Sequence, residues 1–310
     1  MSERGRQDAI RIWKAAVAAV DSESLIARNI RIDRDELTIC GHRISLENLR
    51  HIEVVGAGKA GAGMARGVEH TLATLPSAIT WSGWINVPDD CVDTLLKITL
   101  HGARPAGVNE PTLSGVEGTR EILQRVSQLT EQDLCLVLIS GGGSALLPSP
   151  VEGITLADKL AVTRLLASSG ASIDELNAVR SRLSTVKGGG LARACTAGRL
   201  VALIISDVIG DPLETIASGP TCTAVAETPQ NPLNVLQKYD PGLKHTPEAV
   251  VDSLQQPVVD TPINCDVSNR IIGSNHVALQ AAAACARDLG FTVESWGSEN
   301  DGSASDLGCR

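Results

Sequence analysis

Short apolar runs alternate along the chain with longer segments in which apolar side chains recur every three or four residues. Runs of strand length lie at 52–55, 80–87, 96–100, 134–139 and 200–205. Helical spacing predicts helices over 8–20, 61–72, 115–129, 156–168 and 172–186. This alternation is typical of βαβ units. It predicts an α/β fold, a Rossmann-like doubly wound and mostly parallel sheet with helices on both faces.

The pattern changes beyond residue 221. Residues 227–262 are rich in proline and are expected to form a loop-rich connection. An alanine-rich helix over 276–289, between strands at 269–273 and 291–296, would then begin a second α/β unit. We interpret this unit as incomplete, because the strand 291–296 has no onward partner. The predicted domains are therefore a Rossmann-like N-terminal domain at 1–244 and a second segment at 245–310. The second segment holds the linker and the truncated start of the second domain. A hairpin-like stretch is expected at 31–44.

Composition narrows the class of protein. The chain has 310 residues, a formal net charge of −9 and only 2% aromatic residues, so Val, Leu, Ile and Ala must build the core. The negative charge argues against a nucleic-acid partner. No apolar run approaches the roughly 18 residues of a membrane span, and the eight cysteines form no Cys-x-x-Cys pair. We expect a soluble cytoplasmic protein with small-molecule ligands and no membrane partner. A homodimer is compatible with the sequence, and the oligomeric state stays open.

A polar glycine loop follows the apolar run at 134–139. It reads Ser140-Gly141-Gly142-Gly143-Ser144. Glycines let the backbone turn sharply and bring N–H groups close to an oxyanion. A buried parallel strand that ends in such a loop is a common phosphate site in α/β proteins. Taken alone, the same residues equally suit a tight strand-to-helix turn.

A second glycine loop follows the first strand of the predicted sheet. Gly56, Gly58 and Gly61 match the G-x-G-x-x-G pattern of dinucleotide folds. The acidic residue that would hold a ribose hydroxyl about 20 residues later is missing, and Ala60 stands where a Walker A loop needs Ser or Thr. The remaining feature is a glycine turn at a helix start with Lys59 inside it. It suits a small anion or a transferring phosphoryl group, or else a packing turn with a solvated lysine.

The predicted helix at 172–186 carries basic and polar side chains along one edge. These side chains are Asn177, Arg180, Ser184 and Lys187. Ser172 and Glu175 form a capping box at its start, and the glycines at 188–190 are expected to end it. The edge is interpreted as an anion-binding surface, with a solvated surface as the alternative.

Two aspartates follow the strand at 200–205. Asp207 and Asp211 suit a Mg²⁺ site or a general base. The alternative is a structural role, in which an Asx turn shapes the loop. The ends of parallel strands share one edge of a sheet. The loops at 56–63, 140–144 and 206–211 are therefore expected to converge there.

Six motifs then occur in one order along the chain. They lie at 56–60, 139–147, 177–180, 187–192, 205–211 and 217–221. In this order and at these spacings the chain resembles the type 2 glycerate kinases, whose second domain is called MOFRL. The close match covers about 54–221, and a looser one extends over 8–296.

The resemblance implies an enzyme, a kinase that uses ATP and Mg²⁺ to phosphorylate D-glycerate, usually to 2-phosphoglycerate. It implies catalytic roles for Lys59, Arg180 and Asp207. The implied phosphate- and substrate-binding residues are Gly58, Ser140, Gly141, Gly142, Gly143, Ser144, Asn177 and Lys187. The implied metal ligands are Asp207 and Asp211. Which aspartate is the base, and whether position 2 or 3 is phosphorylated, stays open.

The chain departs from the family pattern in two places. An acidic residue that the family carries near 101–106 is lacking, and family members continue beyond the point where this chain ends. We therefore expect a truncated form that folds its first domain and is weakly active or inactive as a kinase. One alternative is an inactive isoform that binds ligand as a regulatory protein. Another is a nucleotide-dependent oxidoreductase, which the missing ribose acid disfavours.

Overall fold

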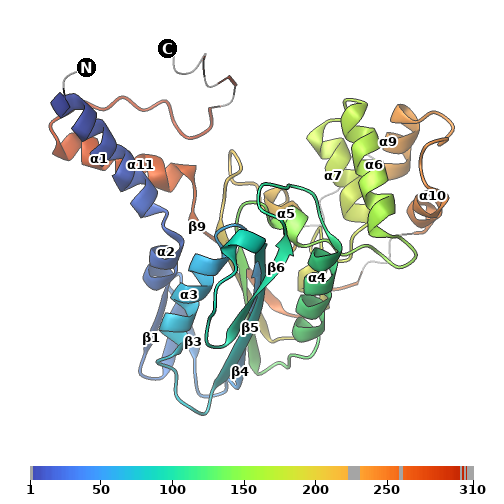
Figure 1. Cartoon of the computed structure of the whole chain (residues 1–310). Coiled ribbons are helices and arrows are strands. Elements are labelled where there is room, and N and C mark those ends of the chain that lie inside the picture. Colours follow the sequence, from blue (N-terminus) through green and yellow to red (C-terminus); the bar gives the residue numbers. More distant parts are fainter. Residues whose placement is uncertain (1–2, 223–230, 258–260, 301, 304, 306–310) are drawn as a thin grey trace.

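A computed structural model describes residues 3–222, 231–257, 261–300, 302–303 and 305 (Figure 1). Its centre is one sheet of six parallel strands in the order β6-β5-β4-β7-β8-β9. These strands are β4 (His51–Ala57), β5 (Thr80–Pro88), β6 (Ile98–Arg104), β7 (Asp133–Ile139), β8 (Arg199–Ile205) and β9 (Asp266–Gly273). The predicted α/β class and parallel sheet are confirmed.

The strand order determines where a ligand can enter. Numbered along the chain, the six strands lie in the order 3-2-1-4-5-6, that of doubly wound dinucleotide folds. The order reverses between β4 and β7, so the chain leaves these two strands toward opposite faces of the sheet. A crevice forms at such a reversal beyond the carboxyl ends of the strands. The loops after β4 and β7 are therefore the first place to look for a site.

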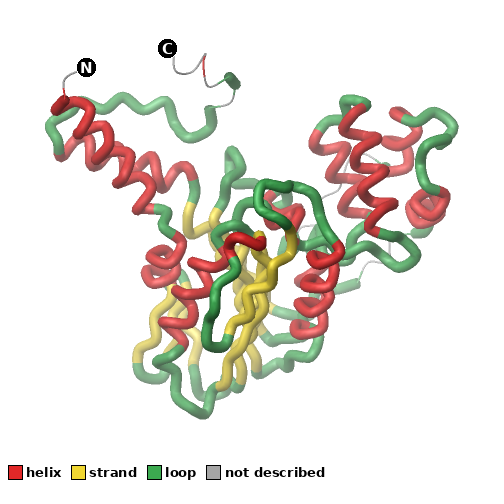
Figure 2. Tube along the Cα trace, in the orientation of Figure 1, coloured by secondary structure: helices red, strands yellow, loops and turns green. Residues whose placement is uncertain are grey.

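Helices cover both faces of the sheet, as Figure 2 shows. The helices are α1 (Glu3–Ala19), α2 (Ser22–Asn29), α3 (Gly61–Leu72), α4 (Leu113–Val126), α5 (Gly143–Leu146), α6 (Leu156–Ser168), α7 (Ile173–Arg182), α8 (Gly190–Ala194), α9 (Pro232–Tyr239), α10 (Glu248–Gln255) and α11 (Asn275–Asp288). Two short 3₁₀ turns lie at Asp89–Cys91 and Ile216–Ser218. The hairpin-like stretch expected at 31–44 is confirmed, and it forms a separate antiparallel sheet of β1 (Ile30–Asp33), β2 (Glu36–Ile39) and β3 (His42–Ser45).

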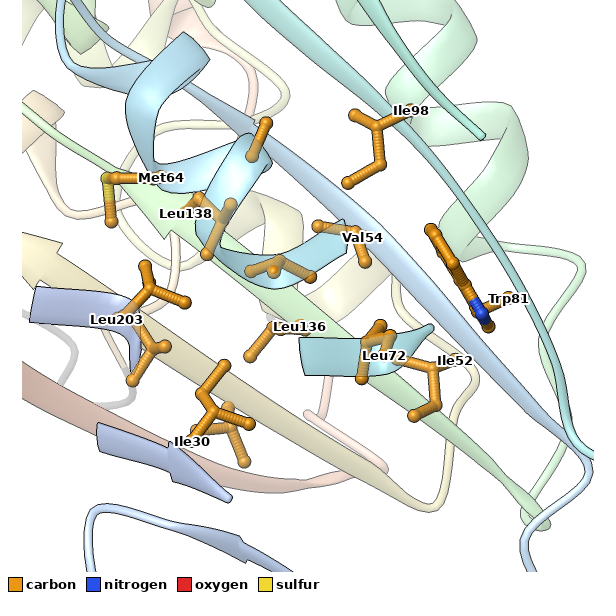
Figure 3. Packing of buried hydrophobic residues seen from close by; sticks show 14 of the residues in the cluster. Ile30, Ile52, Val54, Met64, Leu72, Trp81, Ile98, Leu136, Leu138 and Leu203 are labelled. Carbon is orange, nitrogen blue, oxygen red and sulfur yellow. The ribbon is translucent and has the colours of Figure 1, made fainter. Parts of the chain in front are cut away.

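Alternate strand residues point into two separate cores. Along β7, Leu134, Leu136 and Leu138 pack with α2, α3 and the small sheet, in the core that Figure 3 shows. Cys135, Val137 and Ile139 pack on the other face with α4, α5 and α8. Every residue of β7 is buried, which explains why its sequence is a continuous apolar run rather than an alternating one.

Four helices form a cluster with a core of its own. Helices α6, α7, α9 and α10, called the helical cluster below, pack on one another and lie to one side of the sheet (Figure 1). Their buried side chains are Ile154, Val162, Leu166, Val179, Leu183, Val235, Leu236 and Val250. Both α6 and α7 begin with a capping box, and the one that Ser172 and Glu175 form at α7 confirms the prediction.

Helix α7 is shorter than predicted. It ends at Arg182, and the chain then turns so that Ser184 pairs with Pro150 in an isolated bridge. The backbone of Val151 donates to the Leu183 carbonyl, and that of Thr185 donates to the Ser149 carbonyl. These contacts take the hydrogen-bonding groups that a longer helix would use. The prediction that the glycines at 188–190 end this helix was therefore wrong.

The carboxyl-terminal part also differs from the prediction. Strand β9 pairs with β8 as the sixth strand of the main sheet instead of opening a second sheet. Residues 291–296 are not a strand, since they have no partner edge among the described residues. Helix α10 packs against α6 and α9, and α11 packs against α1. The domain division at residues 244 and 245 stays a prediction. No helix in the described ranges is long and apolar enough to cross a membrane.

Candidate active site

The loops after β4 and β7 are hydrogen-bonded to each other at the reversal of strand order. The backbone N–H of Ser140 donates to the Ala57 carbonyl at 3.1 Å, and that of Lys59 donates to the Gly141 carbonyl at 3.0 Å. The Ala60 N–H donates to Ser140 Oγ at 3.0 Å. The two predicted glycine loops therefore form one rigid surface, with Ser140 as the link between them.

Glycine is required at Gly58 by close approach. A Cβ atom there would lie 1.9 Å from Ser140 Oγ, and the residue has a φ of +152°. Gly142 has a φ of +83°, and a Cβ atom on it would lie 3.2 Å from Cε of Lys59 and 3.1 Å from Nη2 of Arg104. The glycines therefore both join the loops and leave Gly142 bare between two cationic side chains.

Arg104 is a site residue that the sequence reasoning missed. It is the last residue of β6, only 3% of it is exposed, and its buried Nε has no hydrogen-bond partner among the described residues. An arginine directly after the apolar alternation of a buried strand was the signal that could have revealed it. It reaches Gly142 from the far side of β5, beside Lys59.

A second group of polar side chains meets at Ser144, on α5. Its Oγ accepts hydrogen bonds from Nη2 of Arg180 at 2.8 Å and from Nζ of Lys187 at 2.6 Å. Ser218 Oγ lies 3.1 Å from both Ser144 Oγ and Lys187 Nζ. Asn177 accepts from Nη1 of Arg180 at 3.3 Å. Residues far apart in sequence thus form one network on the side of the loop that faces the helical cluster.

The predicted single helical edge is only partly correct. Arg180 and Asn177 lie on α7, whereas Ser184 and Lys187 lie beyond its end. The Ser184 hydroxyl is buried and has no partner among the described residues. Lys187 still reaches Ser144, because the turn after α7 carries it back toward the sheet.

Burial changes the proton affinity of these cations. Lys187 is 5% exposed, and desolvation, with Arg180 and Lys159 nearby, lowers the pKa of its ammonium well below the ordinary value. Burial also lowers the pKa of Arg180. Within the described ranges no carboxylate forms an ion pair with Lys59, Arg104, Arg180 or Lys187. Arg104 and Lys187 are buried without a compensating carboxylate, and such cations favour a bound anion.

Asp207 brings a carboxylate to the opposite side of the loop. A Cβ atom on Gly141 would lie 2.2 Å from its Oδ2. The Asp207 side chain accepts no hydrogen bond from the described residues, and the side-chain turn bond of this loop belongs to Ser206, whose Oγ accepts from the Val208 N–H at 3.2 Å. Asp211 shapes the same turn through its backbone, with a φ of +53° and its N–H donating to the Val208 carbonyl. The Asp207 carboxylate therefore stays available for chemistry.

The donor set at Asp207 fits Mg²⁺ that is shared with a ligand. Mg²⁺ is usually held by one or two carboxylates together with substrate phosphates and water. The described residues contain no group of three or more His, Cys, Asp or Glu side chains that could cage a metal ion. A single exposed carboxylate beside a phosphate-type loop suits such a shared ion, with Asp211 four residues away as the second candidate.

Most of the predicted site residues come together. The residues that meet at the two loops are Gly58, Lys59, Ser140, Gly141, Gly142, Gly143, Ser144, Asn177, Arg180, Lys187 and Asp207. The structure adds Arg104 and Ser218 to them. No described contact joins the Asp211 side chain to this group.

Comparison with known proteins gives consistent matches. The family described as a domain of unknown function, DUF4147, matches residues 8–255. The chain is 38% identical to a glycerate kinase of Rattus norvegicus over 306 residues, 94% of this chain and 56% of the relative. The structure is similar to the PH0495 protein of Pyrococcus horikoshii OT3, with a TM-score of 0.80 and 32% identity over 94% of this chain and 65% of the other. It is also similar to a glycerate kinase of Thermotoga maritima, with a TM-score of 0.74 and 31% identity over 94% of this chain and 64% of the other.

These comparisons agree with the resemblance drawn from the six motifs. The chain spans slightly more than half of the length of the curated relative from rat, at 56%. Residues 8–255, which the family model matches, include strands β4 to β8, both glycine loops and the helical cluster. The residues that build the site therefore all lie within the region of similarity.

Proposed function

This chain belongs to the DUF4147 family, and on that premise we propose that it is a kinase that transfers the γ-phosphoryl group of ATP to D-glycerate. The observation that carries the proposal is the set of cations around the loop 140–144, none of which is ion-paired with a described carboxylate. Glycerate and ATP are both anions, and relatives named glycerate kinase match most of the chain. Mg²⁺ and 2-phosphoglycerate as the product belong to the same proposal.

Phosphoryl transfer requires that the attacking and leaving oxygens are aligned and that the charge on the transferring group is neutralised. It requires no covalent chemistry by the protein. The loop Ser140–Ser144 would hold the phosphates of the nucleotide, since it lies at the reversal of strand order. Lys59 and Arg104 flank Gly142 and would neutralise the charge on the transferring group. Arg180, with Asn177 and Lys187, would bind glycerate from the side of the helical cluster.

The reaction itself is a single displacement. The glycerate hydroxyl oxygen bonds to the γ-phosphorus while the bond from that phosphorus to the bridging oxygen of ADP breaks. The hydroxyl proton needs an acceptor, and Asp207 is the carboxylate placed beside the loop to take it or to hold Mg²⁺. Bound Mg²⁺ supplies charge neutralisation at the phosphates. The cavity of about 400 Å³ next to Asp207, lined in part by Ile205, Val208 and Asn275, has room for a nucleoside.

The test is an ADP-release assay on this chain with D-glycerate, ATP and Mg²⁺, with the product identified by ³¹P NMR. We expect glycerate-dependent ADP formation and a loss of at least about 100-fold in kcat/KM for Lys59→Ala, because a cation at the transferring group is removed. Arg164→Ala is the matched control, since Arg164 pairs with Glu110 on the surface and should leave turnover unchanged. Binding of ATP and glycerate without any turnover would contradict the proposal.

A further inference from the structure

Lys159 is a buried lysine whose ammonium has no hydrogen-bond partner. It lies in the first turns of α6, 8% of it is exposed, and Nζ has no partner among the described residues. The other charged side chains of this helix are satisfied. Asp158 accepts from Thr155 in the capping box, and Arg164 pairs with Glu110. A lysine left alone in this way is unusual, because burial strongly disfavours an unpaired charge.

Lys159 lies on α6, which packs against α7, the helix that carries Arg180. Burial and the nearby Arg180 lower the pKa of Lys159 to about 7, and Lys159 in turn contributes to the lowered pKa of Lys187. The three side chains therefore repel one another. Glu175, a carboxylate of the same helical cluster, does not compensate them, because Lys238 and Tyr239 bind it at 2.7 Å each.

The cations at the glycine loop fall into two groups. Lys59 and Arg104 come from the sheet and flank Gly142, at the reversal of strand order where doubly wound sheets bind nucleotide phosphates. Arg180 and Lys187 donate to Ser144 Oγ, and Lys159 lies on α6, which packs against α7, the helix that carries Arg180. The second group is therefore available to the other anion of the proposed reaction, the acceptor hydroxy acid. The charged group of a hydroxy acid is its carboxylate.

We infer that Lys159 is a third cationic ligand of the subsite formed with Arg180 and Lys187, and that this subsite binds the carboxylate of the acceptor hydroxy acid. The inference rests on the proposed function and adds a substrate-binding residue to it. Lys159 acts by binding, and the reacting atoms are handled by the groups around Gly142 and by Asp207.

The experiment compares the wild-type chain with Lys159→Met, which keeps the length of the side chain and removes the charge. Thermal denaturation and titration calorimetry are carried out with D-glycerate, with its neutral amide and with MgATP. We expect the variant without ligand to melt at a higher temperature, because a repelling buried charge is gone. We expect its affinity for D-glycerate to fall by about tenfold or more while its affinity for MgATP stays within about twofold.

The amide makes the test specific for charge. The preference of the wild type for D-glycerate over the amide should largely disappear in Lys159→Met and persist in the control Arg164→Met, which removes a partnered cation from the same helix. Lys159→Gln serves as a second variant if the methionine does not fold.

Four results would overturn the inference. Unchanged glycerate affinity would make Lys159 a structural residue, and a selective loss of MgATP affinity would place it with the nucleotide. If Lys159→Met keeps the wild-type preference for glycerate over the amide, Lys159 does not bind the carboxylate. In the first and third cases glycerate still binds the wild type, so the proposed kinase function would stand. If the wild type binds no glycerate, the proposed substrate and the carboxylate assignment fail together.

Discussion

The two ends of the parallel sheet both bury charge, and they do so in opposite ways. At the amino end, Glu53 in β4 is 3% exposed and accepts hydrogen bonds from His51 at 3.0 Å, Ser82 at 2.6 Å and Arg125 at 3.0 Å. At the carboxyl end, Arg104, Arg180 and Lys187 have no ion-pair partner in the described part of the chain. Burial of charge therefore does not by itself mark a site, whereas burial without compensation does.

The amino end also shows that a cavity is weak evidence. A cavity of about 400 Å³ is lined there by His51, Glu53, Ser82 and Arg125, among others. Burial alone would raise the pKa of Glu53, but the hydrogen bonds from His51, Ser82 and Arg125 lower it instead. Arg125 is further paired with Glu121 at 2.7 Å. With its charges already satisfied, this network offers little to a charged ligand and is best explained as structural.

The largest expected effect is on the amino end. Glu53→Gln should lower the free energy of unfolding by about 3 kcal/mol, because Arg125 and His51 lose the carboxylate that compensates them. Urea denaturation measures this change. The affinity for D-glycerate should stay unchanged. A loss of binding free energy as large as the loss of stability would show that the amino end is not purely structural and would contradict the comparison.

Arg180→Met should show the reverse pattern at the carboxyl end. We expect the affinity for D-glycerate to fall by at least about 100-fold, because a half-buried guanidinium that would contact the ligand is lost. The free energy of unfolding should stay the same or rise, since the repulsion with Lys159 and Lys187 is relieved. Titration calorimetry and urea denaturation on the same preparation give both numbers. A clear loss of stability without a change in affinity would make Arg180 structural.

The smallest effect is a pH dependence that Lys159 creates. Its folded-state pKa of about 7 lies below the ordinary lysine value, so between these values the unfolded chain binds more protons than the folded one. Stability should therefore rise with pH above 7, and the destabilisation should be fully present at lower pH. From pH 7 to 9 we expect the wild type to gain about 2 kcal/mol relative to Lys159→Met. The free energy of unfolding is measured against pH for both proteins, and two curves that run parallel from pH 7 to 9 would contradict this prediction.

The sequence revealed the loops of the site because each is a local pattern. Ser140–Ser144 and Gly56–Gly61 are turns that directly follow apolar runs, and the capping box at Ser172 is fixed by residues three apart. The motifs also carried the resemblance that the comparisons support. Local patterns of this kind need no knowledge of the rest of the chain.

Other features depend on contacts between distant residues. Arg104 becomes a site residue because the sheet order brings it to Gly142, and Lys159 joins the proposed subsite because α6 packs against α7. Helix α7 stops early because residues 149–151 take over the hydrogen bonds of residues 183–185. The place of β9 beside β8 likewise follows from strand order. Spacing along the chain shows an arginine at the end of an apolar run at Arg104, but it shows neither the contacts that shorten α7 nor the strand order.

The most direct test is a crystal structure of this chain with D-glycerate and a non-hydrolysable ATP analogue. The predicted result is a glycerate carboxylate within hydrogen-bond distance of Arg180 and Lys187, and the nucleotide phosphates along Ser140–Ser144 beside Lys59. Glycerate bound in the cavity at Glu53, or nucleotide phosphates away from the glycine loops, would contradict the account.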